Sequence, residues 1–425
     1  MDLAAWTLDE ERFLRVLGAM MAVCEGLQNS PLGNVLPRED LAGDVVLQEL
    51  SALSQKTPRL RVEPVSYVPG RGNLIITYAG RTSATVAFVG AHLDVVPADP
   101  AEWERPPFAL RVEDGRLYGR GVTDCLGHVA LLTDLFAQLA TSGAELEHTV
   151  VAVIIANEEA SNITGVGIDR LVREGKLDHL RGGPLYWIDS ADFGPTVGTG
   201  GMAAWRLTAE GKAAHSGFPQ DGINAAELAR EATRALQQWF YVTYPAHPLE
   251  PEYGFLTCSS LKPTRVRVDN DTVSKIPARA VVEGDIRLTP WYSAREASER
   301  ASAFIAGLEV ESLPRFGPSR YRVGEQAGKL RFELVGKPVE GIACDRASEG
   351  YRVLAEAIAK TRPQSSPFSF TGSLPYVRFL QDRGFDVQVT GFGRMDTYHA
   401  PNEFAELAHM KQGFQILCHI LAAFG

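Results

Sequence analysis

Short runs of apolar, mostly β-branched residues alternate along much of the chain with longer segments whose apolar residues recur every third or fourth position. The short runs have the composition of strands buried on both faces of a sheet, and the longer segments have the period of amphipathic helices. Strands that alternate with helices predict an α/β domain with a mostly parallel sheet. The clearest strands are residues 73–80, 85–92, 149–157, 184–189 and 386–393, and the clearest helices are residues 126–140 and 349–361.

The pattern changes between residues 202 and 340. The predicted order in this segment is strand, helix, strand, strand, helix, strand, which is the β-α-β-β-α-β order of a ferredoxin-like domain. We therefore expect a discontinuous domain, residues 1–201 and 341–425, with a second domain, residues 202–340, inserted into it. The segments concerned are residues 204–211, 224–240, 255–262, 278–288, 294–308 and 329–336.

The N-terminal segment, MDLAAWTLDEERFLRVLGAMMAVCEG, combines acidic residues with apolar residues at helical spacing. This pattern predicts an amphipathic helix rather than a signal peptide, which would begin with a basic region and continue with an apolar one. Because the chain has no apolar run long enough to cross a bilayer, we expect no membrane span. These features predict a soluble protein of the cytoplasm.

Composition narrows the range of partners. The chain has 425 residues, of which 45% are hydrophobic and 22% charged, and its formal net charge is -10. With this charge and no run of Lys or Arg, we expect neither nucleic acid nor an acidic membrane as a partner. The five cysteines are scattered and form no CxxC motif, which fits a reducing compartment and argues against disulfides or a thiolate zinc site.

Potential metal ligands follow several predicted strands. The strand at residues 149–157 ends in the adjacent pair Glu158 and Glu159, with no Lys or Arg beside them. Neighbouring side chains of a strand point to opposite faces, and two carboxylates repel each other, so a joint role needs a bend and a cation. In open α/β sheets, ligands bind at the carboxyl ends of the strands. The other side chains expected at this edge are His92, Asp94, Asp124, Asp189 and His399.

Each of these features has a simpler explanation when it is taken alone. A histidine near an acid is often a satisfied core residue, an Asp before a helix is often only its N-cap, and a Glu pair after a strand often belongs to a solvated loop. The shared placement of the group at strand ends favours a metal site. Its mixture of nitrogen and oxygen donors suits zinc, cobalt or manganese in a catalytic role. A serine nucleophile is not expected, because the chain has no GxSxG motif.

Several motifs resemble those of a known enzyme family. In chain order they are HLDVVPADPAEWERPPF, DGRLYGRGVTDCLGH, ANEEA, AHSG and YHAPNEF. The chain resembles the co-catalytic dimetal amidohydrolases of the M20 peptidase type, and among these the plant-type acetylornithine deacetylases. The resemblance extends from Arg71 to the C-terminus. It implies a homodimer in which the inserted domain serves as lid and dimerisation domain.

The resemblance also implies a ligand set for two divalent metal ions, zinc or cobalt. His92 and Asp189 would bind one ion, Glu159 and His399 the other, and Asp124 would bridge both.

Three further carboxylates have implied roles or compete for one. Asp94 would fix the tautomer of His92. Glu158 would be the general base that takes a proton from the metal-bridged water and returns it to the leaving amine. Asp192 is a competitor for the place of Asp189 as a ligand.

In the inserted domain, the resemblance implies roles for His215, Arg287 and Ser274. His215, in the sequence HSG, is either a turn histidine or an oxyanion donor that reaches the active site of the other subunit. Arg287 is either a strand-end charge or a fork that grips the α-carboxylate of the substrate. Ser274 stands where the family usually has Asn, which weakens an expected contact with the substrate amide.

Together these features predict hydrolysis of the amide of an N-acyl amino acid. The resemblance implies N2-acetyl-L-ornithine as substrate, with L-ornithine and acetate as products, in arginine biosynthesis. Alternatives within the same mechanism are another N-acyl-amino-acid deacylase, a succinyl-diaminopimelate desuccinylase and a metal dipeptidase. A non-catalytic binding protein on a peptidase scaffold is an alternative from a different class.

Overall fold

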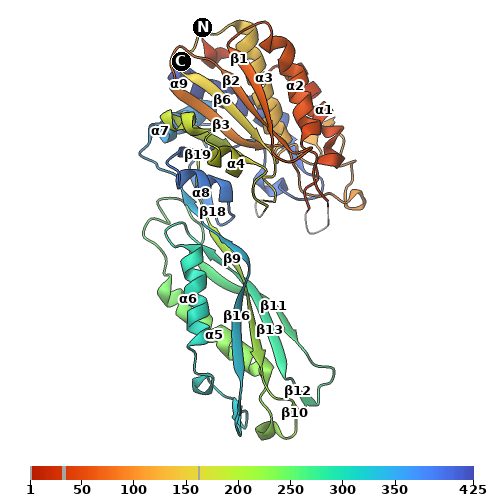
Figure 1. The fold of residues 1–425 in the computed structure, drawn as a ribbon, viewed down its shortest axis with the longest axis vertical. Coiled ribbons are helices and arrows are strands. Elements are labelled where there is room, and N and C mark those ends of the chain that lie inside the picture. The colour runs from red at the N-terminus through yellow and green to blue at the C-terminus, as the bar shows by residue number, and fades with distance from the viewer. Residues whose placement is uncertain (1, 31–34, 161–162) are drawn as a thin grey trace. The chain divides into compact units, whose positions relative to one another are not determined.

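The computed structural model describes residues 2–30, 35–160 and 163–425, and the chain forms two compact units (Figure 1). Unit 1 comprises Met1–Val197, Cys344–Phe368 and Tyr376–Gly425, and unit 2 comprises Gly198–Ala343 and Ser369–Pro375. Within the described ranges, no helix has the length and apolar character needed to cross a membrane. The helices are α1 Glu10–Met21, α2 Asp40–Ser54, α3 Leu126–Ser142, α4 Ile168–Arg173, α5 Ala225–Thr243, α6 Ala294–Ala306, α7 Glu349–Thr361, α8 Pro375–Gln381 and α9 Leu407–Phe424.

A large mixed sheet runs through unit 1. Its strands follow the order β1-β2-β6-β3-β7-β19-β8-β17, and β18 pairs with β8. The four central strands β6, β3, β7 and β19 run parallel, whereas β1, β2, β8 and β17 join antiparallel at the two sides. The strands are β1 Leu60–Ser66, β2 Gly72–Tyr78, β3 Thr85–His92, β6 Thr149–Ile155, β7 Pro184–Ile188, β8 Thr196–Thr199, β17 Ile342–Ala343, β18 Phe368–Phe370 and β19 Asp386–Thr390.

Burial explains why the central strands appear in the sequence as continuous apolar runs. Every residue of β3 and β7 is buried, as are all residues of β6 except the first, because both faces of the sheet are covered. Helix α3 packs against β3, helix α7 packs against β7 and β19, and helix α2 covers β1 and β2. The prediction of an α/β fold is therefore confirmed, with the parallel pairing concentrated in the centre of the sheet. A small antiparallel sheet also contains β4 Arg111–Glu113, β5 Arg116–Tyr118 and β20 Phe404–Glu406.

Unit 2 is built around a four-stranded antiparallel sheet in the order β11-β13-β9-β16. The chain passes through β9, α5, β11, β13, α6 and β16 in turn, so the predicted β-α-β-β-α-β order is present, and α5 and α6 lie on one face of the sheet (Figure 1). The strands of unit 2 are β9 Gly201–Glu210, β10 Ala214–His215, β11 Ser260–Val268, β12 Lys275–Ile276, β13 Arg279–Leu288, β14 Arg322–Val323, β15 Gln326–Ala327 and β16 Lys329–Val339.

One predicted strand of this unit was placed too early. The prediction covered residues 255–262, whereas β11 occupies Ser260–Val268. The apolar residues of the earlier segment suggested a strand, but β11 is an edge strand whose residues from Lys262 onwards are exposed. An exposed edge strand is rich in polar residues, so its sequence lacks the apolar pattern of a buried strand.

Candidate metal centre

The predicted ligands lie at the carboxyl ends of the parallel strands. His92 is the last residue of β3, Asp189 follows β7 directly, and the segment after β19 leads to His399. Asp124 lies just before α3, and its peptide bond to Cys125 is cis. Because β3, β6, β7 and β19 run in one direction, their carboxyl ends share one edge of the sheet.

Asp124 lies between the two histidines. Its Oδ1 is 2.9 Å from Nε2 of His92, and its Oδ2 is 3.1 Å from Nε2 of His399. The carboxylate therefore directs a different oxygen to each imidazole, which is the arrangement that a bridging ligand of two cations requires.

One further carboxylate lies near each of the two histidines that flank Asp124. On the side of His92, Oδ1 of Asp189 is 3.9 Å from Nε2 of His92. On the other side, Oε2 of Glu159 is 3.3 Å from Nε2 of His399. The second oxygen of Glu159, Oε1, is buried and has no hydrogen-bond partner among the described residues.

The structure also distinguishes Asp189 from Asp192, the two aspartates that compete for one ligand position. Asp189 is 5% exposed and forms a compact group with His92 and the thiol of Cys125, in which the potential ligand atoms lie within 4.8 Å of one another. Asp192 is exposed and belongs to no such group among the described residues. The buried thiol of Cys125 was not selected from the sequence, because isolated cysteines carry no spacing signal.

A left-handed residue bends the chain before the glutamate pair. Asn157 has a φ of 63° and is fully buried. After this bend, the carboxylate of Asp94 accepts the backbone N–H of Glu158 at 3.0 Å and that of Glu159 at 3.1 Å. The bend that two neighbouring glutamates need for a joint role is therefore present.

Electrostatics show a local excess of negative charge. Burial, together with the charge of Glu159, raises the pKa of Glu158 to about 8, and burial together with Asp124 raises the pKa of Glu159 to about 7. Hydrogen bonds to Asp124 and Glu159 raise the pKa of His399 to about 11. Burial also raises the pKa of Asp189 well above its usual range. Among the described residues, no Lys or Arg forms an ion pair with these carboxylates.

These observations fit divalent cations. Repelling carboxylates raise their own pKa values unless a positive charge lies beside them, and a bound cation supplies that charge. The donor set, two imidazoles and several carboxylates, suits zinc, cobalt or manganese. The unpaired Oε1 of Glu159 and the two-sided Asp124 provide oxygens for ligation.

A buried polar network supports the bend at Asn157. The Asn157 side chain donates to the carbonyls of Ala160 and Ile163, and its Oδ1 accepts from Arg71 at 3.0 Å. Arg71 is in turn held by the buried carboxylate of Glu39 at 2.6 Å. Sequence reasoning missed this support, although the polar ending of an apolar strand, IIANEE, is a signal for it.

Glu403 is a second support that the sequence analysis did not identify. Its buried carboxylate accepts the backbone N–H groups of Gly121, Thr123 and Asp124, and it pairs with Arg120 at 2.7 Å. Because Glu403 follows His399 by four residues, this contact joins the segment of His399 to the segment of Asp124.

The three predicted residues of the inserted segment lie at two places in unit 2. His215 and Ser274 are neighbours, because β10 pairs with β12 and the N–H of Ser216 donates to the carbonyl of Ser274 at 2.9 Å. His215 is exposed, and its Nδ1 accepts the N–H of Gly217 at 3.0 Å. Arg287, on β13, donates through Nε to Asp285 at 2.7 Å and through Nη1 to the carbonyl of Thr371 at 3.3 Å.

Comparison with known proteins agrees with this architecture. The chain is 43% identical to an acetylornithine deacetylase of Dictyostelium discoideum, over 97% of each sequence. It is 42% identical to an acetylornithine deacetylase of Arabidopsis thaliana, over 98% of this chain and 96% of the relative. The crystal structure of human carnosine dipeptidase 1 has a similar fold, with a TM-score of 0.68, 19% identity, and coverage of 97% of this chain and 96% of that chain.

A family model, described as peptidase family M20/M25/M40, matches residues 88–423. The match begins within β3, before His92, and spans the segment of Asp124, the glutamate pair and the segment of His399. The resemblance to M20-type enzymes that the motifs indicated is thereby confirmed. The chain belongs to peptidase family M20/M25/M40.

Proposed function

We propose that this protein hydrolyses the amide bond of N2-acetyl-L-ornithine and releases L-ornithine and acetate, as a step of arginine biosynthesis. The observation that carries this proposal is the identity of 43% and 42% to two acetylornithine deacetylases over nearly the whole chain. A location in the cytoplasm, which is a reducing compartment, is supported by the five cysteines, which are all free.

We assign the ligand roles from the geometry around Asp124. Two divalent ions, zinc or cobalt, would share Asp124, with His92 and Asp189 as further ligands of one ion and Glu159 and His399 as further ligands of the other. Bound ions of this kind lower the pKa of water and polarise the substrate carbonyl.

Glu158 is the general base of the proposed reaction. It takes a proton from the attacking water as the water oxygen bonds to the carbonyl carbon. It then gives that proton to the amine nitrogen as the C–N bond breaks. Its position supports this role, because the carboxylate of Asp94 accepts the backbone N–H of Glu158 and so fixes the place of this residue beside the ligands.

The test of the substrate is a panel of N-acyl amino acids assayed with zinc and with cobalt. The panel contains N2-acetyl-L-ornithine, other N-acetyl amino acids, N-succinyl-diaminopimelate and dipeptides, so that the alternative substrates are measured beside the proposed one. We expect the highest kcat/KM for N2-acetyl-L-ornithine. A higher value for another member would reassign the substrate, and binding without turnover of any member would indicate a non-catalytic protein.

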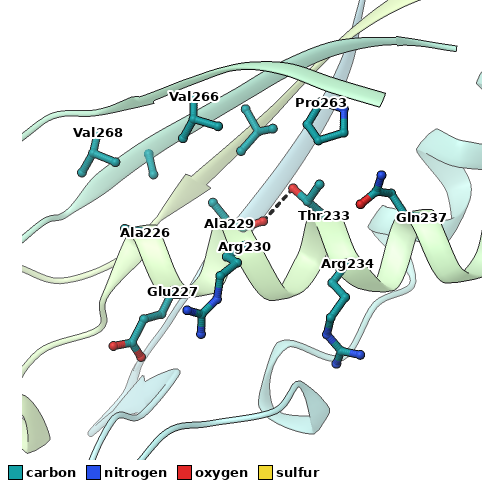
Figure 2. Close-up of a pocket in the computed structure, with 12 residues that line it drawn as sticks. Ala226, Glu227, Ala229, Arg230, Thr233, Arg234, Gln237, Pro263, Val266 and Val268 are labelled. Atoms are coloured by element: carbon teal, nitrogen blue, oxygen red, sulfur yellow. Dashed lines mark hydrogen bonds between the residues drawn. The ribbon is translucent and has the colours of Figure 1, made fainter. Parts of the chain in front are cut away.

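We also propose a homodimer formed through unit 2. Between α5 and β11 lies a groove of about 610 Å³, and Figure 2 shows Val266, Val268 and Pro263 above the helix that carries Ala229 and Thr233. Val266 and Val268 are 65% and 40% exposed. Exposed apolar residues that lie together beside a groove mark a surface for association, whereas single exposed apolar residues do not.

A second copy of the chain is the occupant that the edge strand favours. β11 ends the sheet order β11-β13-β9-β16, so its outer backbone groups have no partner strand among the described residues. Two copies related by a two-fold axis can pair such strands antiparallel and cover each other's grooves. We expect Val266→Glu to convert a dimer to a monomer in analytical ultracentrifugation. Val112→Glu, at a valine of similar exposure in unit 1, is the control, and equal sedimentation of both variants would contradict this interface.

In this dimer, unit 2 acts as a lid and contributes to the substrate site. We propose that His215 of a second copy donates a hydrogen bond to the developing oxyanion, and its exposed ring and Gly217-flanked turn support this role. We propose that Arg287 binds the α-carboxylate of the substrate. Its guanidinium is held by Asp285 and Thr371, which fixes its direction and leaves further N–H groups for a ligand. Ser274, beside His215, is the proposed contact to the substrate amide.

A further inference from the structure

A chain of three hydrogen bonds lies behind the metal centre. The backbone N–H of Phe392 donates to Nε2 of His128 at 2.8 Å, and Nδ1 of His128 lies 3.4 Å from Sγ of Cys125. The Sγ of Cys125 donates to the carbonyl of Ile188 at 3.5 Å. His128, Cys125, Ile188 and Phe392 are all fully buried. We call these four residues the His128 relay.

The two ends of the His128 relay determine where its protons lie. A backbone N–H can only donate, so Nε2 of His128 accepts and carries no proton. A backbone carbonyl can only accept, so the thiol of Cys125 gives its proton to Ile188. His128 is therefore the neutral tautomer with its proton on Nδ1, which donates to the sulfur of Cys125.

Three members of the His128 relay adjoin segments that carry a ligand. Cys125 directly follows Asp124, and Ile188 directly precedes Asp189. Phe392 lies on the segment that continues from β19 to His399. One imidazole thus connects the start of α3, the end of β7 and the end of β19, three segments that are far apart in the sequence.

We propose that His128 is a positioning residue that holds the ligands Asp124 and Asp189 at the spacing the metal ions require; this inference rests on the ligand roles assigned above. Without the relay, the N–H of Phe392 would be buried and unpaired, and the backbones beside Asp124 and Asp189 would lose a common anchor. Partners behind the ligands of a metal set the affinity because they limit the motion of the ligands.

A packing role is the alternative, because the rings of His128 and Phe392 lie 5.6 Å apart. Three substitutions separate the two roles. His128→Asn places an amide N–H near the position of Nδ1 and keeps the bond to Cys125, but it is too short to reach Phe392. His128→Gln places an amide oxygen near the position of Nε2 and keeps the bond to Phe392. His128→Leu fills the space and removes both bonds.

The control is Leu135→Ala, which opens a cavity on the same helix but outside the relay. The full-length proteins are freed of metal with a chelator, their melting temperatures are measured, and Co²⁺ is titrated in competition with a chromophoric chelator. The visible absorption spectrum of bound Co²⁺ reports the geometry of its ligands.

We expect the wild-type chain to bind Co²⁺, and Leu135→Ala to bind it equally tightly with the same spectrum despite a lower melting temperature. We expect His128→Leu to weaken Co²⁺ binding by about 10- to 100-fold and to change the spectrum. His128→Asn and His128→Gln should each give a smaller loss, and they carry the test if His128→Leu fails to fold.

Two results would overturn different parts of the argument. If the His128 variants bind Co²⁺ as tightly as Leu135→Ala does and give the wild-type spectrum, the relay has only a packing role. If the wild-type chain itself binds no divalent ion, the proposed metal centre is wrong, and the relay has no ligands to position.

Discussion

Oδ1 of Asp94 accepts the backbone N–H of Glu158 at 3.0 Å. The same carboxylate lies 3.5 Å from Nδ1 of His92, whereas the backbone carbonyl of Asp94 lies closer to that nitrogen, at 2.8 Å. The carboxylate of Asp94 therefore lies closer to the backbone N–H of Glu158 than to the ring of His92, and it supports the turn of the glutamate pair at least as strongly as it supports the histidine. Its other oxygen, Oδ2, also accepts from the side-chain amide of Asn29 at 2.8 Å.

The first prediction follows from this turn. In Asp94→Asn, the amide NH₂ faces a backbone N–H and cannot accept it, so one hydrogen bond of the turn is lost. We expect turnover to fall by about 10- to 100-fold, as for other residues that support metal sites. The control is Asp192→Asn, at an exposed aspartate three residues after Asp189, and this variant should keep wild-type turnover. Steady-state kinetics check both variants, and an equal effect at the two positions would contradict the role of Asp94.

The second prediction separates the two adjacent glutamates. Glu158→Gln removes the proposed base but no ligand, so we expect metal content to stay at the wild-type level and turnover to fall by about 100- to 10,000-fold. Glu159→Gln removes a proposed ligand of the His399 side, so we expect metal content to fall. Elemental analysis and kinetics on the same samples check both. Near-normal turnover of Glu158→Gln with both ions bound would show that another group is the base.

The third prediction concerns the metal ions as a whole. Because the carboxylates around Asp124 have no Lys or Arg partner among the described residues, we expect cations to be needed for turnover. Dialysis against a chelator should abolish hydrolysis, and added zinc or cobalt should restore it. Hydrolysis that persists in protein shown by elemental analysis to contain no metal would contradict the proposed chemistry.

Much of the fold could be predicted from the sequence because buried elements have strong patterns. β3 and α7 begin and end where the apolar pattern placed them, at Thr85–His92 and Glu349–Thr361. β11 was misplaced because its exposed residues, such as Arg265 and Arg267, contribute no apolar signal. The apolar pattern of a sequence reflects which residues are buried, and few residues of an edge strand are buried.

The residues of the candidate site also fall into two groups, those that could be predicted from the sequence and those that could not. His92, Asp189 and the glutamate pair were found because the carboxyl ends of parallel strands are a general place for ligands. Glu403, Arg71 and Asn157 were missed, since each acts through contacts between segments far apart in the sequence, for example 283 residues for Glu403 and Arg120. No local pattern reports such a pairing.

The fourth prediction tests the support that Glu403 gives to the segment of Asp124. Glu403→Gln leaves the charge of Arg120 buried without a partner, and removing one member of a buried pair costs about 3–5 kcal/mol. We expect a clear fall in the temperature of thermal unfolding. The double variant Arg120→Met with Glu403→Gln removes both charges but keeps an amide oxygen for the backbone N–H groups, and it should recover much of that loss. An unchanged melting temperature in Glu403→Gln would show that the pair contributes little.

The last prediction concerns His215 and assembly. His215 is exposed in unit 2, and among the described residues it is not part of a metal-ligand group. If His215 of one copy supplies an oxyanion donor to the other, His215→Ala should keep metal content and melting temperature while turnover falls by about 100- to 1,000-fold. Ser274→Ala changes the neighbour of His215, and we expect it to lower turnover less than His215→Ala does. The proposed role of Ser274 is a contact to the substrate amide, not to the oxyanion.

Mixing two inactive variants distinguishes action within one chain from action between chains. Random dimers of His215→Ala and Glu158→Gln contain mixed pairs in about half of the molecules, and each mixed pair has one site with both Glu158 and His215 intact. We therefore expect recovery of about a quarter of the wild-type activity after subunit exchange. Exchange is followed with two fluorescent labels in the same samples. No recovery despite demonstrated exchange would mean that His215 acts within its own chain or has no part in the reaction.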